Sequence, residues 1–224
     1  MDSDERPARI FFVRHGQTDW NRTLRYQGST DMALNENGRS QARKAGLRLS
    51  RVIPCRVFSS PMLRAYGTAE AITEAGAADA PIETMDDLRE ISFGEWEGLT
   101  YPEIIERHAS DYRAWTETPF SSSPTGGESF ESVRTRSARA AEAVKSACAP
   151  GAAILVVAHG IVLRALLSSL ADAGDSSLIW RAHLDNCSVS ALDLSRGGPS
   201  LAFLNDTNHL RLDDEKIGIL SFPG

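Results

Sequence analysis

The sequence contains few cysteines and has no spacing of them that is typical of a cross-linked or metal-bound protein. Only 3 occur among 224 residues, Cys55, Cys148 and Cys187. Their odd number and wide separation do not match a disulfide framework, and no pair has the close spacing of a zinc site. We therefore expect three ordinary buried thiols in a reducing compartment.

Positive charge is also scarce. The chain has 24 Lys and Arg against 30 Asp and Glu, a formal net charge of −6. Affinity for a nucleic-acid backbone comes mainly from a positive surface, so a nucleic-acid partner is not expected. An anionic substrate would have to be captured by local positive groups, because the field of the whole protein repels it.

No hydrophobic run is long enough to predict a membrane span. The most apolar stretch, 152–170, is interrupted by His159, Gly160 and Arg164. The segment Met1–Arg9 is polar and carries both signs of charge, unlike a secretory signal. Hydrophobic residues at 42% and charged residues at 24% are ordinary for a globular protein. We expect a cytoplasmic protein with no membrane partner.

Short apolar runs alternate with helical patterns along the chain. Asn35 is a predicted N-cap, Ser60-Pro61 predicts a second helix start that leads to a stop at Gly76, and Ser129 opens a third helix. The predicted strands are 10–13, 56–59, 81–84, 152–158, 189–194 and 201–204, and a further helix is predicted over 160–170. This order predicts an α/β fold, a three-layer α/β/α sandwich with a mostly parallel central sheet. We expect one domain over 1–224, with a helical lid inserted over about 91–127, where proline and serine are frequent.

Chemically useful side chains follow three of the predicted strands. Arg14 and His15 end the first, Arg64 lies just beyond the second, and His159 and Gly160 end the central one. Ligands of parallel sheets bind at the carboxyl ends of strands, so these groups should converge if the strands are neighbours. Arginine matches phosphate oxygens, neutral imidazole is a nucleophile, and a helix N-terminus favours an anion. The pattern indicates phosphoryl transfer.

Further motifs extend this pattern over nearly the whole chain. In order they are Arg14-His15-Gly16-Gln17-Thr18, Trp20-Asn21, Tyr26-Gln27-Gly28, Ser59-Ser60-Pro61 with Arg64, Leu88-Arg89-Glu90, Gly94-Glu95-Trp96-Glu97-Gly98, Gly126-Gly127-Glu128-Ser129, Ala158-His159-Gly160 and Asn205-Asp206-Thr207. The sequence resembles the histidine phosphatase superfamily, also called the phosphoglycerate mutase-like family.

This resemblance implies a role for each matched residue. His15 would attack phosphorus and become a phosphohistidine, with Glu90 as general acid and base. The phosphoryl oxygens would be held by Arg14, Arg64 and His159, and further phosphate or substrate contacts would come from Asn21, Gln27, Gly28 and Gly160. The resemblance implies no metal and no cofactor, and a homodimer is compatible with it.

Several assignments have simpler alternatives. Glu83, Asp86 and Asp87 lie near Glu90, and Asn21 could be no more than a loop cap. His108, His183 and His209 have no motif support and are predicted to be structural or surface residues. The aromatic residues of the lid, Trp96, Tyr101, Tyr112 and Trp115, could form its own small core or contact substrate.

Three functions are compatible with these residues. The favoured one is a phosphomonoesterase that hydrolyses a small phosphorylated metabolite. A cofactor-dependent phosphoglycerate mutase is the alternative, but the lid has only Arg107 and Arg113, six positions apart, where mutases have adjacent arginines. The lid's carboxylates would also repel a multiply anionic substrate, which favours a single phosphate on a neutral or apolar carrier. A non-catalytic phospho-ligand-binding or regulatory protein would be expected to lack one of the core groups, and none is missing.

The segment 204–210 resembles a tail found in small phosphatases, including those acting on α-ribazole phosphate.

Overall fold

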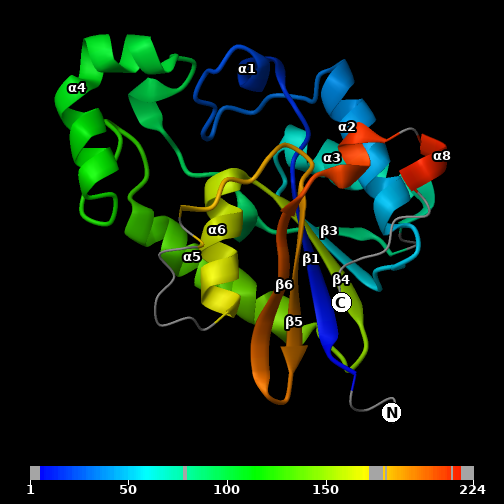
Figure 1. Ribbon diagram of the computed structural model, residues 1–224. Coiled ribbons are helices and arrows are strands. Elements are labelled where there is room, and N and C mark those ends of the chain that lie inside the picture. The colour runs from blue at the N-terminus through cyan, green and yellow to red at the C-terminus, as the bar shows by residue number, and fades with distance from the viewer. Residues whose placement is uncertain (1–5, 78–79, 172–178, 180, 213, 218–224) are drawn as a thin grey trace.

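A six-stranded sheet forms the centre of the molecule (Figure 1). This computed structural model describes the chain apart from residues 1–5, 78–79, 172–178, 180, 213 and 218–224, so much of the polar segment Met1–Arg9 lies outside the described residues. The strand order is β3-β2-β4-β1-β5-β6. The strands are β1 (Ala8–Arg14), β2 (Arg56–Ser59), β3 (Ile82–Thr84), β4 (Ala153–Ala158), β5 (Val189–Ser195) and β6 (Gly198–Asp206).

The pairing of the strands determines where the site is built. β4 pairs in parallel with both β1 and β2, and β2 pairs in parallel with β3, whereas β5 runs antiparallel to β1 and β6. The mostly parallel sheet is therefore confirmed. Since β2, β4 and β1 are neighbours with the same direction, their carboxyl ends lie side by side at one edge.

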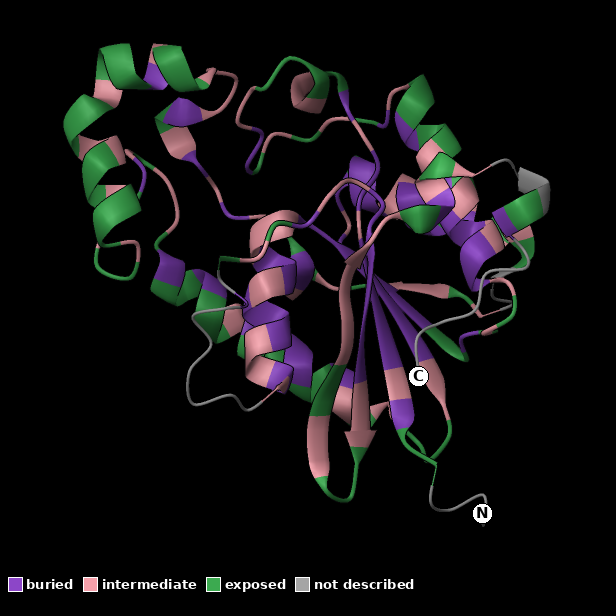
Figure 2. Ribbon diagram, viewed as in Figure 1, coloured by how far each residue is buried: buried purple, intermediate pink, exposed green. Residues whose placement is uncertain are grey.

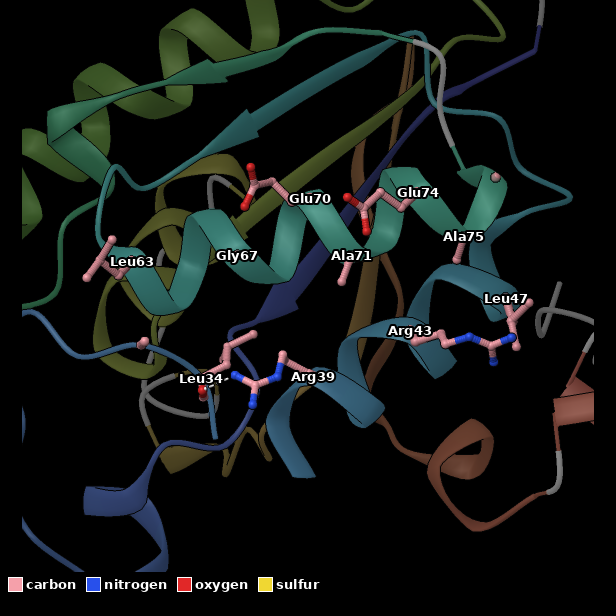
Figure 3. A pocket seen from close by; sticks show the side chains of 12 residues that line it. Leu34, Arg39, Arg43, Leu47, Leu63, Gly67, Glu70, Ala71, Glu74 and Ala75 are labelled. Carbon is pink, nitrogen blue, oxygen red and sulfur yellow. Dashed lines mark hydrogen bonds between the residues drawn. The ribbon is translucent and has the colours of Figure 1, made fainter. Parts of the chain in front are cut away.

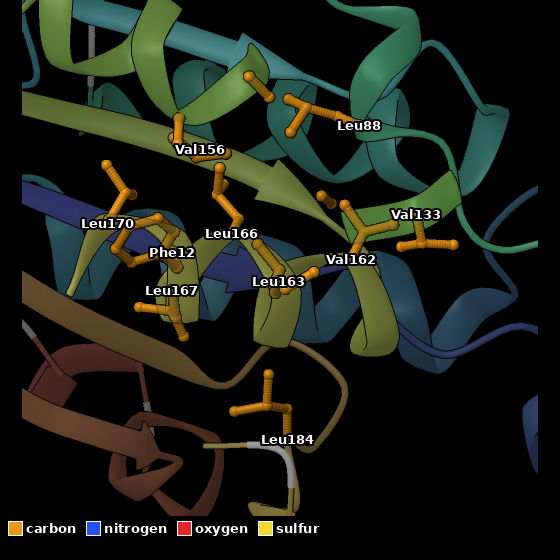
Figure 4. Close-up of a cluster of buried hydrophobic side chains, with 14 of the residues drawn as sticks. Phe12, Leu88, Val133, Val156, Val162, Leu163, Leu166, Leu167, Leu170 and Leu184 are labelled. Carbon is orange, nitrogen blue, oxygen red and sulfur yellow. The ribbon is translucent and has the colours of Figure 1, made fainter. Parts of the chain in front are cut away.

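Helices cover both faces of the sheet, as a three-layer sandwich requires. Along β1, Phe11 faces the helices α2 (Glu36–Leu49) and α3 (Leu63–Ile72), and Phe12 faces α5 (Phe130–Ser146) and α6 (Gly160–Leu170). This alternation follows from the period of two along a strand. Figure 4 shows the cluster around Phe12, and Figure 2 shows that the central strands are buried while the outer helix faces are exposed. Burying each large apolar side chain contributes about 1.5–3 kcal/mol.

The predicted helix starts are correct at two positions and wrong at a third. Asn35 Oδ1 accepts from the backbone N–H of Gly38, and Ser129 Oγ from that of Ser132, as N-caps do. The helix predicted to start at Ser60-Pro61 begins instead at Leu63. Ser60 Oγ lies 2.8 Å from the His159 ring, and the N–H of Leu63 donates to a carboxylate oxygen of Asp31 at 2.8 Å. The cap is thus supplied from a distant loop, which local sequence does not reveal. Gly76, the predicted stop, has φ +86° in the last turn after α3, where a glycine is favoured.

The predicted lid contains two helical pieces and an aromatic cluster. They are η4 (Gly94–Trp96) and α4 (Tyr101–Glu117), and α4 is kinked at His108. The Trp96 ring is fully buried and packs against Tyr26, Tyr112 and Trp115. The smaller elements are α1 (Asp19–Arg22), η2 (Thr73–Ala77), η3 (Asp86–Leu88), η5 (Asn208–Arg211) and α8 (Asp214–Ile217).

All three cysteines are free, but the prediction that all are buried is wrong. Cys187 is buried, Cys148 is half-buried and Cys55 is exposed. Cys55 lies just before β2, where the chain enters the sheet, and its Sγ donates to the Ala153 carbonyl. Within the described part of the chain, no helix combines the length and apolarity that crossing a bilayer requires.

Candidate active site

A cavity of about 460 Å³ opens at the carboxyl edge of β1, β2 and β4, and it gathers the predicted site residues. Of these, Arg14, His15, Asn21, Gln27, Gly28, Arg64, Glu90 and Gly160 line it. A larger cavity of about 890 Å³ lies between α2 and α3 (Figure 3), but its described lining includes no predicted site residue. The smaller cavity is therefore the candidate active site.

His15 is held at the end of β1 with one ring nitrogen fixed. Its backbone N–H donates to the Ala158 carbonyl at 2.9 Å, which ties it to β4. Its Nδ1 lies 2.8 Å from the Gly16 carbonyl oxygen. Because a carbonyl only accepts, Nδ1 carries the proton and Nε2 keeps its lone pair. Burial, followed by the charges of Arg64 and Arg14, holds the pKa of His15 well below 6.5. The imidazole is therefore neutral near pH 7 and can act as a nucleophile.

His159 lies beside His15, and both of its nitrogens are engaged. The two ring centroids are 5.1 Å apart. Nδ1 of His159 accepts from Arg64 Nε at 3.2 Å, so Nε2 carries the proton and donates to Ser60 Oγ at 2.8 Å. The ring is fully buried and is not among the described residues that line the cavity. Its described side-chain bonds are to Arg64 and Ser60, and the direct contact with phosphate predicted from the sequence stays a prediction.

The two predicted phosphate-binding arginines lie at the inner end of the cavity, where Arg64 is buried and Arg14 is half-buried. Arg64 is fully buried, and its Nη atoms donate to the carbonyls of Thr30 and Gly28 at 2.9 and 2.8 Å. Burial lowers the pKa of both Arg14 and Arg64, and the Glu90 charge opposes that effect. Both guanidinium groups stay charged at pH 7 because arginine starts from so high a value. Arg14 Nε is buried with no partner among the described residues, a donor suited to an anion.

Glu97, a lid residue whose role the sequence did not reveal, organises the loop that holds Arg64. Its carboxylate accepts from the backbone N–H groups of Ser29, Thr30 and Phe93 at 2.8–3.0 Å. The hydroxyls of Ser29 and Thr30 add two further bonds. These bonds outweigh burial and lower the pKa of Glu97. Gly28, at φ +54°, passes so close that a Cβ there would lie 2.3 Å from Glu97 Oε1. The bonds to Glu97 fix the carbonyls that in turn hold Arg64.

Glu90 lies at the amino end of α6. Its carboxylate accepts from the N–H groups of Ile161 and Val162 at 3.2 and 3.4 Å and from that of Ile91 at 3.0 Å. Unpaired N–H groups at a helix start attract a carboxylate, which accounts for this position. A Cβ added to Gly160 would lie 4.0 Å from Glu90 Oε2 and 3.7 Å from Arg14 Nε, so the glycine leaves this corner open. Of the acidic candidates nearby, Glu90 lines the cavity, and Glu83, Asp86 and Asp87 are not in its described lining.

Asn21 and Gln27 form a small network next to the nucleophile. Asn21 caps α1 together with Thr18, whose hydroxyl donates to Gln27 Oε1 at 2.8 Å. The Asn186 amide donates to the His15 carbonyl at 2.9 Å. The capping role of Asn21 and its place in the cavity lining therefore coexist.

The acidic lid does not face the cavity, which corrects the repulsion argument drawn from the sequence. None of the carboxylates of the lid and of the start of α5 is in the described lining, namely Glu95, Glu97, Glu103, Glu106, Asp111, Glu117, Glu128 and Glu131. Several are bound to other groups, as Glu103 is to Thr100 and Arg25, and Glu128 is to Arg136. A count of charges along the segment could not reveal this orientation.

The outer part of the cavity is lined mostly by apolar residues, none of which the sequence assigned to the site. Phe93 and Trp115 line it while belonging to the lid's aromatic cluster, so both alternatives for that cluster apply. The remaining outer lining comprises Leu24, Arg25, Tyr26, Ile161, Arg164, Ala182, His183 and Leu184. His183, predicted to be a surface residue, is exposed and pairs with Asp185 at the mouth.

Comparison with known proteins gives the site its context. The model of the "Histidine phosphatase superfamily (branch 1)" matches residues 10–207. The chain belongs to the histidine phosphatase superfamily. Phosphoserine phosphatase 1 of Hydrogenobacter thermophilus is 34% identical over 203 residues, covering 91% of this chain and 94% of that protein. The structure of a mycobacterial glucosyl-3-phosphoglycerate phosphatase has a TM-score of 0.78 at 30% identity, covering 89% of this chain and 99% of that one.

A bifunctional protein of Mycobacterium tuberculosis is 38% identical over 206 residues, covering 91% of this chain. This histidine phosphatase chain spans only 55% of that relative's length. The family and fold predicted from the sequence are thus confirmed, and the named enzymes among these relatives are phosphatases.

Proposed function

We propose that the protein is a phosphomonoesterase that hydrolyses a small phosphorylated metabolite through a phosphohistidine on His15. The observation that carries this proposal is a neutral, buried imidazole whose Nε2 keeps its lone pair, next to two guanidinium groups that line the same cavity. Phosphoryl transfer depends mainly on positioning and on charge stabilisation, and this arrangement supplies both.

The proposed reaction has two steps. Nε2 of His15 attacks phosphorus, the P–O bond to the alcohol breaks, and Glu90 in its protonated form donates a proton to the departing oxygen. Glu90 then removes a proton from water, which attacks the phosphohistidine and releases inorganic phosphate. Arg14 and Arg64 balance the charge on the phosphoryl oxygens in both steps. The contacts of His159 support a positioning role in which it holds Arg64.

The mutase alternative has less support. A mutase must hold a second anionic group of its substrate, for which the lid offered Arg107 and Arg113. Neither arginine is among the described residues that line the cavity. The substrates named for the relatives, phosphoserine, glucosyl-3-phosphoglycerate and α-ribazole phosphate, are the first candidates for this chain.

The roles of His15 and Glu90 are separable by the choice of leaving group. Glu90→Gln should lower kcat/KM for an alkyl phosphate by about 10²–10⁴-fold. For 4-nitrophenyl phosphate, whose leaving group needs little protonation, the loss should be much smaller. Equal losses for both esters would contradict the acid role of Glu90. A panel containing the three candidate esters, and 3-phosphoglycerate with its bisphosphate primer, tests the substrate. Isomerisation faster than phosphate release would favour the mutase.

A further inference from the structure

Leu24, at the mouth of the cavity, is held in a backbone conformation that bulky residues avoid. Its φ is +56°, in the left-handed region that favours glycine. Four described non-glycine residues have positive φ, namely Leu24, Ile53, Cys187 and Asn205. Of these four, Leu24 alone is in the described lining of the cavity.

Hydrogen bonds on either side of Leu24 hold this conformation. Its own N–H donates to the Asn21 carbonyl at 3.2 Å. The next residue, Arg25, forms a β-bridge with Thr100 and donates from Nη1 to the Gly98 carbonyl at 2.6 Å. The backbone is thus fixed on both sides of Leu24, to α1 beside the inner end of the cavity and to the lid.

Leu24 is 79% exposed, the largest value among the exposed large hydrophobic residues described. In the free protein, an exposed leucine in a strained conformation contributes no core packing, and its backbone strain lowers stability. Such a combination at the rim of a site indicates a role in binding. Tyr26, Trp115 and Leu184 add apolar surface to the same lining.

We infer that Leu24 is a specificity-determining residue that packs on the leaving group of the substrate. The substrate class is then a phosphomonoester whose alcohol carries an apolar or aromatic group long enough to extend from the inner end of the cavity, where the phosphate binds, to its mouth. This inference rests on the proposed phosphomonoesterase function and goes beyond it, because the phosphoryl chemistry itself needs no contact at Leu24.

The test compares two esters in wild type and in Leu24→Gly. Glycine accepts φ +56° without strain, so the fold is retained, with the thermal midpoint unchanged within about 2 °C or raised. The kcat/KM for 2-naphthyl phosphate should fall about tenfold, because the apolar contact is lost. The kcat/KM for ethyl phosphate, which is too short to reach the mouth, should change less than about twofold. Leu24→Asn, which also tolerates this conformation, should repeat the result.

Ile53→Gly is the matched control. Ile53 has φ +50° and is 65% exposed, but it lies before β2, at the edge of the sheet opposite the cavity. Its substitution should relieve the same strain and leave both esters unaffected. An equal loss for both esters in Leu24→Gly, or no loss for either, would overturn the inference. A wild type that hydrolyses ethyl phosphate but not naphthyl phosphate would also overturn it, whereas failure to hydrolyse any ester would overturn the proposed function instead.

Discussion

The inner end of the cavity and the lid are held together in different ways. At the inner end, His15, Arg64 and His159 are buried, and nearly every polar atom is bound to backbone or to another side chain. The lid is held by packed aromatic rings and by carboxylates that bind lid residues or the adjoining loop. This difference indicates that the inner end determines the reaction and the mouth determines the choice of substrate. Substitutions at the inner end should impair all phosphomonoesters alike, whereas those around the mouth should discriminate between them.

The largest effect is expected at the nucleophile. His15→Ala should lower kcat by roughly 10⁴-fold or more for every ester, because no other group can form the phosphoryl-enzyme. Steady-state kinetics on an alkyl and an aryl phosphate measures the loss. Circular dichroism should show an unchanged fold, and turnover near that of wild type would remove His15 from the mechanism.

The next effect is expected at Arg64. Arg64→Lys keeps the charge but loses the planar fork that bonds His159, Gly28 and Thr30 together, so kcat/KM should fall about 10²-fold. Inorganic phosphate should inhibit the variant more weakly by a similar factor. Arg113→Lys, at an exposed position of the lid, is the control and should behave like wild type. A loss confined to one ester would contradict the division between the two regions.

Glu97 connects the two regions, and a smaller effect is expected there. Glu97→Gln replaces an acceptor of several N–H and O–H groups with one that also donates, so the loop that holds Arg64 should loosen. We expect kcat/KM to fall about tenfold for all esters, with weaker inhibition by phosphate. Asp111→Asn is the control, because Asp111 binds Ser110 and Thr125 within the lid. If both variants lose stability equally and neither changes phosphate inhibition, Glu97 does no more than hold the lid.

The smallest effect on activity is expected at His209, which supports the inner end from behind. His209 is fully buried and its Nε2 donates to the Cys187 carbonyl, while the Cys187 N–H donates to the Arg14 carbonyl. Burial lowers the pKa of His209 to about 4. The unfolded state, with a pKa near 6.5, therefore binds the proton first as pH falls.

The free energy of unfolding should consequently decrease by about 2 kcal/mol between pH 7 and pH 5 from this group. His209→Gln should show a shallower decrease over that range in denaturant titrations, with activity at pH 7 within about twofold of wild type. An unchanged slope would show that His209 does not contribute to the acid sensitivity.

Sequence patterns predicted most of the fold because they report local chemistry. The continuous apolar run of β4 indicated a strand covered on both faces, and Asn35 and Ser129 marked helix starts whose caps lie within one turn. The start of α3 was predicted wrongly because its first N–H binds Asp31, which is far away in sequence.

In the candidate site, too, the sequence predicted the features that depend on local patterns and missed those that depend on distant contacts. Strand ends and motifs were sufficient to predict that Arg14, His15, Arg64 and Glu90 lie around one cavity. The loop-holding role of Glu97, the direction of the lid carboxylates and the two engaged nitrogens of His159 depend on tertiary contacts. A list of charges along the chain does not contain that information.

Chemical trapping of the phosphorylated enzyme tests the central claim most directly. Wild type quenched during turnover of a labelled phosphomonoester should carry phosphate that is labile to acid and stable to base, and peptide mapping should place it on His15. The His15→Ala variant should carry none. Phosphate that survives acid, as on serine, or that is lost in base, as on a carboxylate, would contradict the mechanism.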